Sequence, residues 1–282
     1  NMFAQTLILM FLGSHINGFA LDVSSRNAGL YPNVGSRIVG GLEAPKGSAN
    51  HMVALVTGDR IKSLMCGGSI ITPNHVLTAA HCIEFAVIWG ELLPSYQGVI
   101  GSYFFNIIDK ELTLLFTGFY IHETWDSLSI KDDIGILKTA AGIPLSNRVE
   151  VLSLNFDWID EVVKSSVTGW GTTELMMPTP DRLQALNVST ITGADCVRRI
   201  REKEQLGWRM PPVEPHREIC TYHSPGYGMC HGDSGSPLIL KKTRTQIGIV
   251  SWGVPCAVGG PDVFVRISAY RSWINNTVGN NL

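Results

Sequence analysis

The sequence predicts an all-β fold, a sandwich or a barrel, that ends in one amphipathic helix. Its 282 residues include 29 glycines and 14 prolines without a repeating period, which indicates many turns. Short apolar runs rich in β-branched residues, such as residues 247–250 and 263–265, are separated by Gly, Pro and Asn and are typical of strands. Near the end, apolar residues recur at three- and four-residue steps, which predicts a helix. These residues are Ile267, Tyr270, Trp273, Ile274 and Val278.

The composition narrows the class of protein. Apolar residues make up 45% of the chain, which excludes disorder as its main state. Charged residues make up 16%, below the roughly 25% of an average soluble chain. The 22 basic and 24 acidic residues give a formal net charge of −2. Because this balance does not favour binding to a polyanion, we expect no nucleic acid partner.

The N-terminal segment predicts export. Residues 7–12 form an apolar run that is too short to span a bilayer, which needs roughly 20 residues. Gly18 and Ala20 are the two small residues that a signal peptidase reads, so we expect a signal peptide over residues 1–20. A buried strand or helix is the alternative. No other stretch of the sequence reaches spanning length, so we expect a secreted, extracellular protein without a membrane partner, whose six cysteines form disulfides.

Residues 21–37 are polar, rich in turn residues and free of cysteine, which is typical of an activation pro-segment that ends at Arg37. The motif Arg-Ile-Val-Gly-Gly follows at residues 37–41. Cleavage after Arg37 would free an ammonium group on Ile38. Farther along the chain, Asp233 is a candidate for a buried carboxylate, and an unpaired buried charge is very costly. We therefore expect the new ammonium group of Ile38 to pair with Asp233.

Two segments in the first half carry candidate catalytic residues. In Thr-Ala-Ala-His-Cys at residues 78–82, small residues leave the ring of His81 accessible, and Cys82 could fix it by pairing with Cys66. A structural histidine is the alternative. In Asp-Ile-Gly-Ile-Leu at residues 133–137, Asp133 heads an apolar run, so we expect its carboxylate to be buried and partnered. The alternatives are a turn aspartate before a strand, and Asp132, which lies farther from the buried run.

A third candidate lies in Gly-Asp-Ser-Gly at residues 232–235. A serine hydroxyl is a poor nucleophile until a base takes its proton, and Ser234 would use such a base. The flanking glycines let the backbone turn its amides toward a developing oxyanion. A polar turn is the alternative, but it leaves Asp233 unexplained.

Taken together in this order, the four segments resemble the trypsin/chymotrypsin family of serine endopeptidases over residues 38–282. The resemblance implies two packed six-stranded antiparallel β-barrels with the active site in the cleft between them. The first barrel would cover about 38–150, the second about 151–266 and a C-terminal helix about 267–278.

The same resemblance implies the role of each residue. His81 would act first as general base and then as general acid, Asp133 would orient its ring, and Ser234 would attack the scissile carbonyl. The backbone N–H groups of Gly232 and Ser234 would form the oxyanion hole.

Further features follow from the resemblance. It pairs Cys66 with Cys82, Cys196 with Cys220, and Cys230 with Cys256. It makes Ser251, Trp252 and Gly253 a strand that binds the substrate backbone and forms one wall of the specificity pocket. Residues 222–230 and 260–264 are most similar to insect chymotrypsin-like proteases. Asn187 and Asn275 begin sequons for N-glycosylation, which become plausible only on the secretory route. The region after His81 has only Glu91 as a carboxylate at the place of the family's calcium loop, so we expect no metal and no cofactor.

The specificity pocket is expected to differ from that of a trypsin. Gly228 stands where a trypsin carries the aspartate that pairs with Lys or Arg, while Asp262 stands at a pocket-wall position that is commonly glycine. Met229 adds an adaptable apolar surface at the base. If Asp262 points into the pocket, basic side chains are favoured. If it turns into a hydrogen-bonded niche, the pocket selects Phe, Tyr, Leu and Met, and this second arrangement is our expectation, because a desolvated carboxylate facing an apolar substrate is costly.

Two residues depart from the family pattern. Ser236 replaces a glycine behind the nucleophile, where it would tighten the packing, and Gly135 replaces an alanine. The 23 residues between Cys196 and Cys220 contain a mixed-sign charge cluster, which predicts a solvated helix face, with a rim loop that touches substrate as the alternative.

The predicted function is a secreted digestive endopeptidase made as a zymogen, with a chymotrypsin-like or broad P1 preference. Its expected partners are protein or peptide substrates, an activating trypsin-like protease and protein protease inhibitors, and we expect a monomer. A non-catalytic secreted homologue is the main alternative, and such proteins usually lose a residue of the triad. An α/β-hydrolase is excluded because its elbow needs Gly-x-Ser-x-Gly and places the histidine last.

Overall fold

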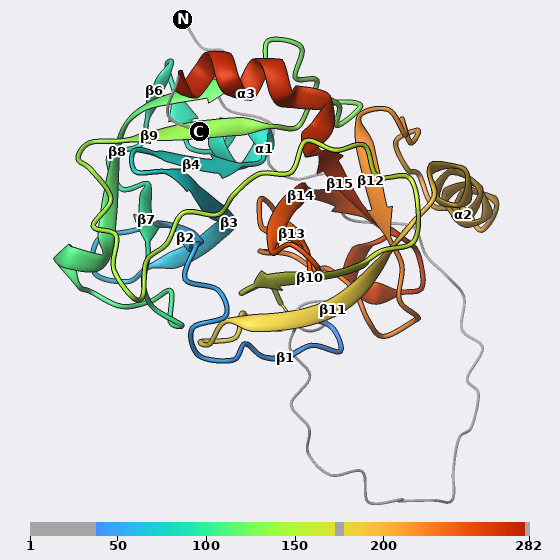
Figure 1. Cartoon of the computed structure of the whole chain (residues 1–282), viewed down its shortest axis with the longest axis horizontal. Coiled ribbons are helices and arrows are strands. Elements are labelled where there is room, and N and C mark those ends of the chain that lie inside the picture. Colours follow the sequence, from blue (N-terminus) through green and yellow to red (C-terminus); the bar gives the residue numbers. More distant parts are fainter. Residues whose placement is uncertain (1–37, 173–177, 280–282) are drawn as a thin grey trace, which may run out of the picture. The chain divides into compact units, whose positions relative to one another are not determined.

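A computed structural model of the chain describes residues 38–172 and 178–279. The expected signal peptide and pro-segment lie outside the described residues. Strands dominate the described part, and all pairings between named strands are antiparallel. The expected all-β fold is confirmed, and Figure 1 shows its two groups of strands.

The first group of strands closes on itself in the order β2-β3-β4-β9-β8-β7, which makes a six-stranded barrel. Its strands are β2 (Met52–Thr57), β3 (Ser63–Thr72), β4 (His75–Thr78), β7 (Gln97–Val99), β8 (Thr113–Ile121) and β9 (Gly135–Thr139). The barrel is filled by aliphatic side chains that water does not reach, among them Leu55, Ile70, Leu77 and Ile136. Burying each of them contributes roughly 1.5–3 kcal/mol to folding. A separate hairpin joins β5 (Val87–Ile88) to β6 (Glu91–Leu92).

The second group runs in the order β11-β10-β13-β14-β15-β12, and β12 pairs back onto β11 to close another six-stranded barrel. Its strands are β10 (Lys164–Gly169), β11 (Gln184–Ile191), β12 (Glu218–Thr221), β13 (Pro237–Leu240), β14 (Thr245–Gly253) and β15 (Asp262–Arg266). The short strand β1 (Leu42–Glu43) adds to the outer edge of β11. The core of this barrel includes Val167, Ile219, Leu238 and Phe264.

The predicted C-terminal helix is present and binds the first barrel, although it follows the second in sequence (Figure 1). Its start is a 3₁₀ turn, η3 (Ile267–Tyr270), and α3 (Arg271–Val278) continues it. Ile274 and Val278 pack into the core of the first barrel, and Trp273 donates its indole N–H to Glu123 at 3.3 Å. Two other 3₁₀ turns are η1 (Lys110–Leu112) and η2 (Pro255–Ala257).

The charge cluster between Cys196 and Cys220 forms a solvated helix face, as the sequence predicts. Helix α2 (Gly193–Gln205) begins after Thr192, whose hydroxyl caps it by accepting the N–H of Asp195 at 3.2 Å. Gly193, Cys196 and Ile200 are its buried positions. On the other face Arg198 and Arg199 both pair with Asp195, one turn or less away.

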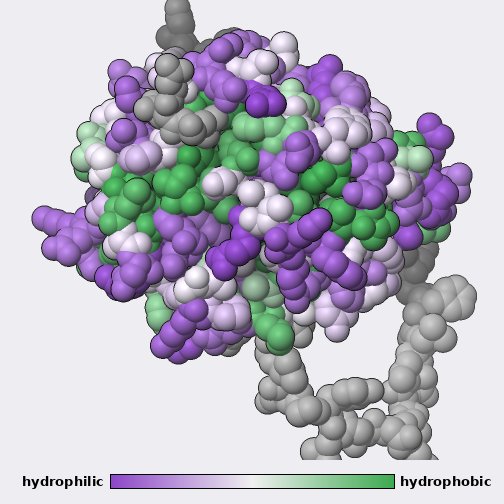
Figure 2. All heavy atoms as spheres, viewed as in Figure 1, coloured by the Kyte–Doolittle hydropathy of each residue, from purple (hydrophilic) through white to green (hydrophobic). Residues whose placement is uncertain are grey.

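The three disulfides of the structure are the pairs that the resemblance implies, Cys66–Cys82, Cys196–Cys220 and Cys230–Cys256. No helix within residues 38–172 and 178–279 combines the length and the apolarity that crossing a membrane requires. On the face shown in Figure 2, hydrophobic side chains are interspersed among hydrophilic ones.

Candidate active site

The ring of His81 is positioned by a short helix that follows β4. Helix α1 (Ala80–Glu84) begins directly after Ala79, and Ala79 and Ala80 are fully buried, whereas the side chain of His81 is 17% exposed. The disulfide between Cys82 and Cys66 ties the helix to β3. Small residues on one side and a crosslink on the other therefore hold the ring at the surface of the first barrel.

Asp133 lies two residues before the start of β9 and is 1% exposed. Its carboxylate accepts the backbone N–H of His81 at 2.9 Å, the ring Nδ1–H of His81 at 2.8 Å and the hydroxyl of Ser251 at 2.6 Å. Three donors thus compensate the burial of this charge. The bond to Nδ1 keeps the proton on that nitrogen and leaves Nε2 as the basic one.

The electrostatics of His81 suit a base. Burial lowers the pKa of the His81 ring. The charge and the hydrogen bond of Asp133, together with the charge of Glu84, raise the pKa by more than burial lowers it, so the pKa lies above its ordinary value. Asp132, the alternative candidate, has other hydrogen-bond partners and, in the described chain, no hydrogen bond to His81. Its carboxylate accepts from Thr124, Tyr270 and Arg217 at 2.6, 2.7 and 2.8 Å.

Ser234 lies in the loop between Cys230 and β13, and two glycines shape that loop. Gly232 and Gly235 have φ of 95° and 79°, which glycine adopts without strain. The carbonyl of Ser234 accepts the N–H of Gly67 at 2.7 Å, which seats the loop against β3. Within the described residues, neither the N–H of Gly232 nor that of Ser234 donates to another group, so both remain available to an oxyanion.

His81 and Ser234 line neighbouring cavities that share Ser251. Ser234 lines a cavity of about 190 Å³ and His81 one of about 530 Å³. The ring and the hydroxyl are therefore brought to one cleft, although no hydrogen bond joins His81 Nε2 to Ser234 Oγ in the part of the chain that the structure describes. Such catalytic contacts often tighten only with substrate bound.

Asp233 is completely buried and has hydrogen bonds but no cation. Its carboxylate accepts the N–H groups of Gly171 at 2.8 Å and Cys230 at 3.1 Å. Burial raises its pKa to about 7, against the lowering effect of these two bonds. Among residues 38–172 and 178–279 no Lys, Arg or His forms an ion pair with it. Gly171 is needed here because a Cβ at that position would overlap the carboxyl group.

Ile38 is fully buried and packs in the same apolar cluster as Met229 and Val188, inside the second barrel. The next residue, Val39, forms a β-bridge with Gly228, whose N–H donates to the carbonyl of Val39 at 3.1 Å. The segment that would become the new N-terminus therefore borders the loop of Asp233 and the specificity pocket.

Asp262 lines the same cavity as Ser234. The walls are formed by Met229, Cys230, His231, Ser234, Val250, Ser251, Trp252, Gly253, Val254 and Asp262. A Cβ at Gly228 would lie 2.9 Å from Asp262 Oδ2, so the missing side chain of Gly228 provides the space for this carboxyl group. Met229 donates its N–H to Asp262 at 3.1 Å. Burial, and then the charge of Asp233, raise the pKa of Asp262 to about 8, while the Met229 bond lowers it.

The sequence offered two arrangements for Asp262, and the structure combines features of both. The carboxyl group lines the pocket, as in the first arrangement, and it has a hydrogen bond from the backbone, as in the second. Gly228 itself does not line the cavity. Because it has no side chain, it leaves the space that the carboxyl group of Asp262 occupies.

Residues 251–253 form the end of β14, where Trp252 and Gly253 pair with β15 on one side only. The register shifts between Val250 and Trp252, so Ser251 has no partner on β15 and turns its hydroxyl to Asp133. Within the described residues no strand pairs with the other side of residues 251–253, which leaves an edge that an extended peptide can join.

The two departures from the family pattern have local reasons. A Cβ at Gly135 would lie 2.6 Å from the Cδ1 of Ile83, so glycine suits the contact between β9 and α1. Ser236 is buried against Gly67, and its hydroxyl has no hydrogen-bond partner in the described chain. The extra group therefore fills space beside Gly67.

Sequence reasoning missed Gly171, His231 and Val254. Gly171 donates to Asp233 from 62 residues away, and only the small pattern Gly-Trp-Gly at residues 169–171 could have drawn attention to it. His231 and Val254 are direct neighbours of recognised motifs, so counting outward from those motifs could have found them.

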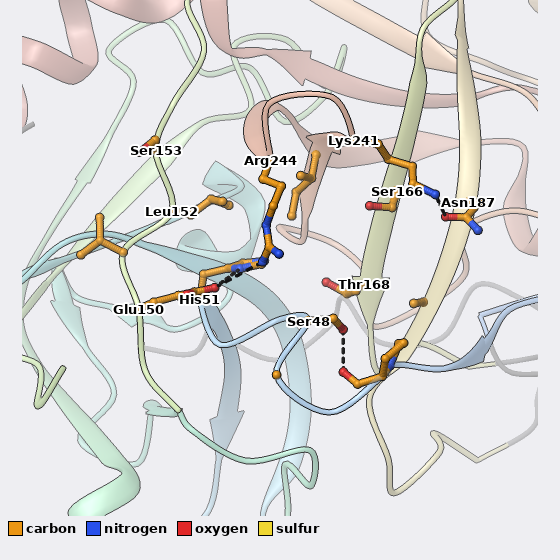
Figure 3. Close-up of a pocket in the computed structure, with 15 residues that line it drawn as sticks. Ser48, His51, Glu150, Leu152, Ser153, Ser166, Thr168, Asn187, Lys241 and Arg244 are labelled. Atoms are coloured by element: carbon orange, nitrogen blue, oxygen red, sulfur yellow. Dashed lines mark hydrogen bonds and ion pairs between the residues drawn. The ribbon is translucent and has the colours of Figure 1, made fainter. Parts of the chain in front are cut away.

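A further cavity of about 660 Å³ lies elsewhere and is lined by none of the predicted catalytic residues (Figure 3). Arg244 and Glu150 face one another on one side of it, and Lys241 donates to Asn187 on the other. Both sequon residues, Asn187 on β11 and Asn275 on α3, are exposed. Among the described residues the one group with metal-ligand spacing is Cys66, His81 and Cys82, whose two sulfurs are already joined to each other.

Comparison with known proteins agrees with this geometry. Residues 38–274 match the family described as Trypsin. The relatives include Chymotrypsin-2 of Vespa crabro, 32% identical over 84% of this chain and 98% of the relative. Chymotrypsin-C of Rattus norvegicus is 33% identical over 89% of this chain and 92% of the relative, and Brachyurin of Leptuca pugilator is 30% identical over 86% and 99%.

The chain therefore belongs to the trypsin family. It is a serine endopeptidase, a hydrolase that acts on protein or peptide substrates, and chymotrypsins of insects and mammals are among its relatives.

Proposed function

We propose that this endopeptidase works through Ser234, His81 and Asp133, and that it is made as a secreted zymogen. The observation that carries the proposal is the buried carboxylate of Asp133, which holds the Nδ1–H of His81 at 2.8 Å beside the cleft that Ser234 lines. A ring fixed in this tautomer is a base ready to accept a proton on Nε2.

The proposed reaction has two halves. His81 Nε2 takes the proton of Ser234 while Oγ forms a bond to the scissile carbonyl carbon, and the resulting oxyanion accepts the N–H groups of Gly232 and Ser234. His81 then gives the proton to the leaving amine, the C–N bond breaks, and an acyl-enzyme remains. In the second half, His81 takes a proton from a water molecule, whose oxygen attacks the acyl carbon. His81 then returns the proton to Ser234 Oγ, the ester bond breaks, and the carboxylic acid product leaves.

The experiment that tests this function is a digest of a defined peptide library by protein cleaved after Arg37. We expect new termini at internal peptide bonds, and an ester substrate should give a burst of one equivalent of leaving group as the acyl-enzyme accumulates. A cleaved, folded protein without a burst and without internal cleavage would contradict the proposal.

Activation and export are part of the proposal. The uncompensated burial of Asp233 supports an activation step in which the free ammonium of Ile38 becomes its partner. The partners in that case are a trypsin-like activating protease and, later, protein protease inhibitors. Asn187 and Asn275 are exposed and accessible to glycosylation on the secretory route. We further propose a digestive role and a monomer.

For the P1 side chain we propose a broad pocket with a chymotrypsin-like preference near neutral pH. Asp262 has a pKa of about 8, so its carboxyl group is mostly neutral at pH 7 and does not oppose a large apolar residue. Above pH 8 it ionises. The pocket then carries a negative charge, which favours Lys or Arg.

The preference should therefore depend on pH. Between pH 6.5 and 9.5 we expect the ratio of kcat/KM for an Arg substrate to that for a Phe substrate to rise by roughly thirtyfold, in step with the ionised fraction of Asp262. The ratio is the right measurement because the titration of His81 affects both substrates equally.

Two variants serve as controls for this prediction. Asp262→Asn keeps the size and the Met229 contact but cannot ionise, so its ratio should stay flat across the pH range. Asp262→Gly should also lose any preference for basic residues. A wild-type ratio that is flat with pH, or one that already favours Arg at pH 6.5, would contradict the role given to Asp262.

A further inference from the structure

A buried ion pair joins the loop that carries Asp133 to β12 of the second barrel, next to the indole of Trp252. Lys131 comes from the first barrel, two residues before Asp133, and Glu218 begins β12 of the second barrel. Lys131 Nζ lies 2.8 Å from Glu218 Oε1, and the two side chains are only 8% and 7% exposed.

Glu218 has further partners. The same Oε1 accepts the indole N–H of Trp252 at 2.8 Å, and Oε2 accepts the backbone N–H of Glu214 at 2.6 Å. The ammonium of Lys131 also lies 5.1 Å from the centre of the Trp252 ring. One carboxylate thus binds the cation of one barrel and the indole that projects from residues 251–253.

The backbone that presents Lys131 is unusual. Its neighbours Ile130 and Asp132 have φ of 52° and 56°, a region that a β-branched residue rarely adopts. Such a conformation persists where the surroundings hold it. Here Asp132 is held by Arg217 at 2.8 Å and by Tyr270 at 2.7 Å, both outside the first barrel, and Lys131 is held by Glu218.

We propose that Lys131 and Glu218 are positioning residues for extended substrates, acting through the indole of Trp252. They fix that indole and, with it, the free edge of residues 251–253 against the loop of Asp133. A substrate that contacts only the P1 pocket needs little of this edge, whereas a peptide that continues along it needs the whole edge in place. The inference rests on the proposed function of the same cleft.

The test uses a pair of double variants that differ in whether residue 218 can accept the indole N–H of Trp252. In Lys131→Met/Glu218→Met both charges are replaced by apolar chains of similar length, so no buried charge is left unpaired. In Lys131→Met/Glu218→Gln the charges are also gone, but the amide oxygen can still accept the N–H of Trp252. Each variant is assayed with a single-residue ester and with a four-residue peptide substrate that share one P1 residue.

We expect the Met/Met variant to lose about three- to tenfold in kcat/KM on the peptide, mainly through KM, because one fixing hydrogen bond is absent. Its activity on the ester should change less than twofold. The Met/Gln variant should recover most of the loss on the peptide. If the pair merely stabilises the fold, both double variants lose activity on both substrates alike, and that result overturns the proposal.

A second measurement covers a Met/Met variant that fails to fold. Trp252→Phe removes the indole N–H together with one ring of the side chain, and it should reduce peptide cleavage in the wild-type background by at least the same three- to tenfold. No such reduction would overturn the proposal. Failure of the proposed function is distinguishable, because in that case the wild type would give no burst with the ester at all.

Discussion

Ser234→Ala and His81→Ala are each expected to lower kcat by about five orders of magnitude, and the double variant should be little worse than either one. The reason is that the hydroxyl and the ring act as one unit: without the base the nucleophile keeps its proton, and without the nucleophile the base has nothing to activate. The measurement is the steady-state rate on one peptide substrate for the two single variants and the double variant.

The matched control is Ser236→Ala, two residues along the same loop. Its hydroxyl is buried and has no hydrogen-bond partner in the described chain, so its removal should leave kcat within about twofold. Losses that multiply in the double variant would show that Ser234 and His81 work independently, contrary to the assignment. Thermal unfolding of each variant verifies that the fold is retained.

The second large effect concerns activation. Arg37→Gln should remain inactive after treatment with a trypsin-like protease, because no ammonium is freed on Ile38. Asp233→Asn should be cleaved normally and yet have kcat lowered by roughly a hundredfold, which is what the loss of one oxyanion donor costs. The physical reason is that Asp233 stands between the two residues whose N–H groups would bind the oxyanion.

Activity in the Arg37→Gln protein equal to that of cleaved wild type would contradict this mechanism, as would full activity in Asp233→Asn. N-terminal sequencing should find Ile38 at the new end of the wild type and of Asp233→Asn.

Ionisation of Asp233 predicts how the stability of the cleaved form depends on pH. Its pKa is raised to about 7 in the absence of a cation, and pairing with Ile38 should lower that pKa. The stability that the cleaved form gains over the uncut form should therefore grow as the pH rises toward 7 and be fully present above pH 7.

The sequence predicted the local features well, because their signals are local. The density of Gly and Pro and the short apolar runs predicted the strands, and the motifs around His81, Asp133 and Ser234 each lie within a few residues. The number of barrels followed from the family resemblance, since no local pattern states how strands close on themselves. The three- and four-residue steps near the end could not separate the 3₁₀ turn η3 from α3, because the three-residue step fits both.

Long-range contacts were beyond the sequence. Lys131 and Glu218 are 87 residues apart, and Gly171 and Asp233 are 62 apart, with no motif to connect them. The position of Asp262 could be counted from the sequence, but the direction of its carboxyl group depends on the space left by Gly228 and on the N–H of Met229. Tertiary packing decides both which distant residues come into contact and how the Asp262 side chain is oriented.

The most direct test of the central claim is labelling with a fluorophosphonate, followed by mass spectrometry of the tryptic peptides. Protein cleaved after Arg37 should carry one adduct, on Ser234, and its formation should be lost in His81→Ala and strongly slowed in the uncut chain. An adduct on another serine, or labelling of Ser234 at the same rate before and after cleavage and in His81→Ala, would contradict the account.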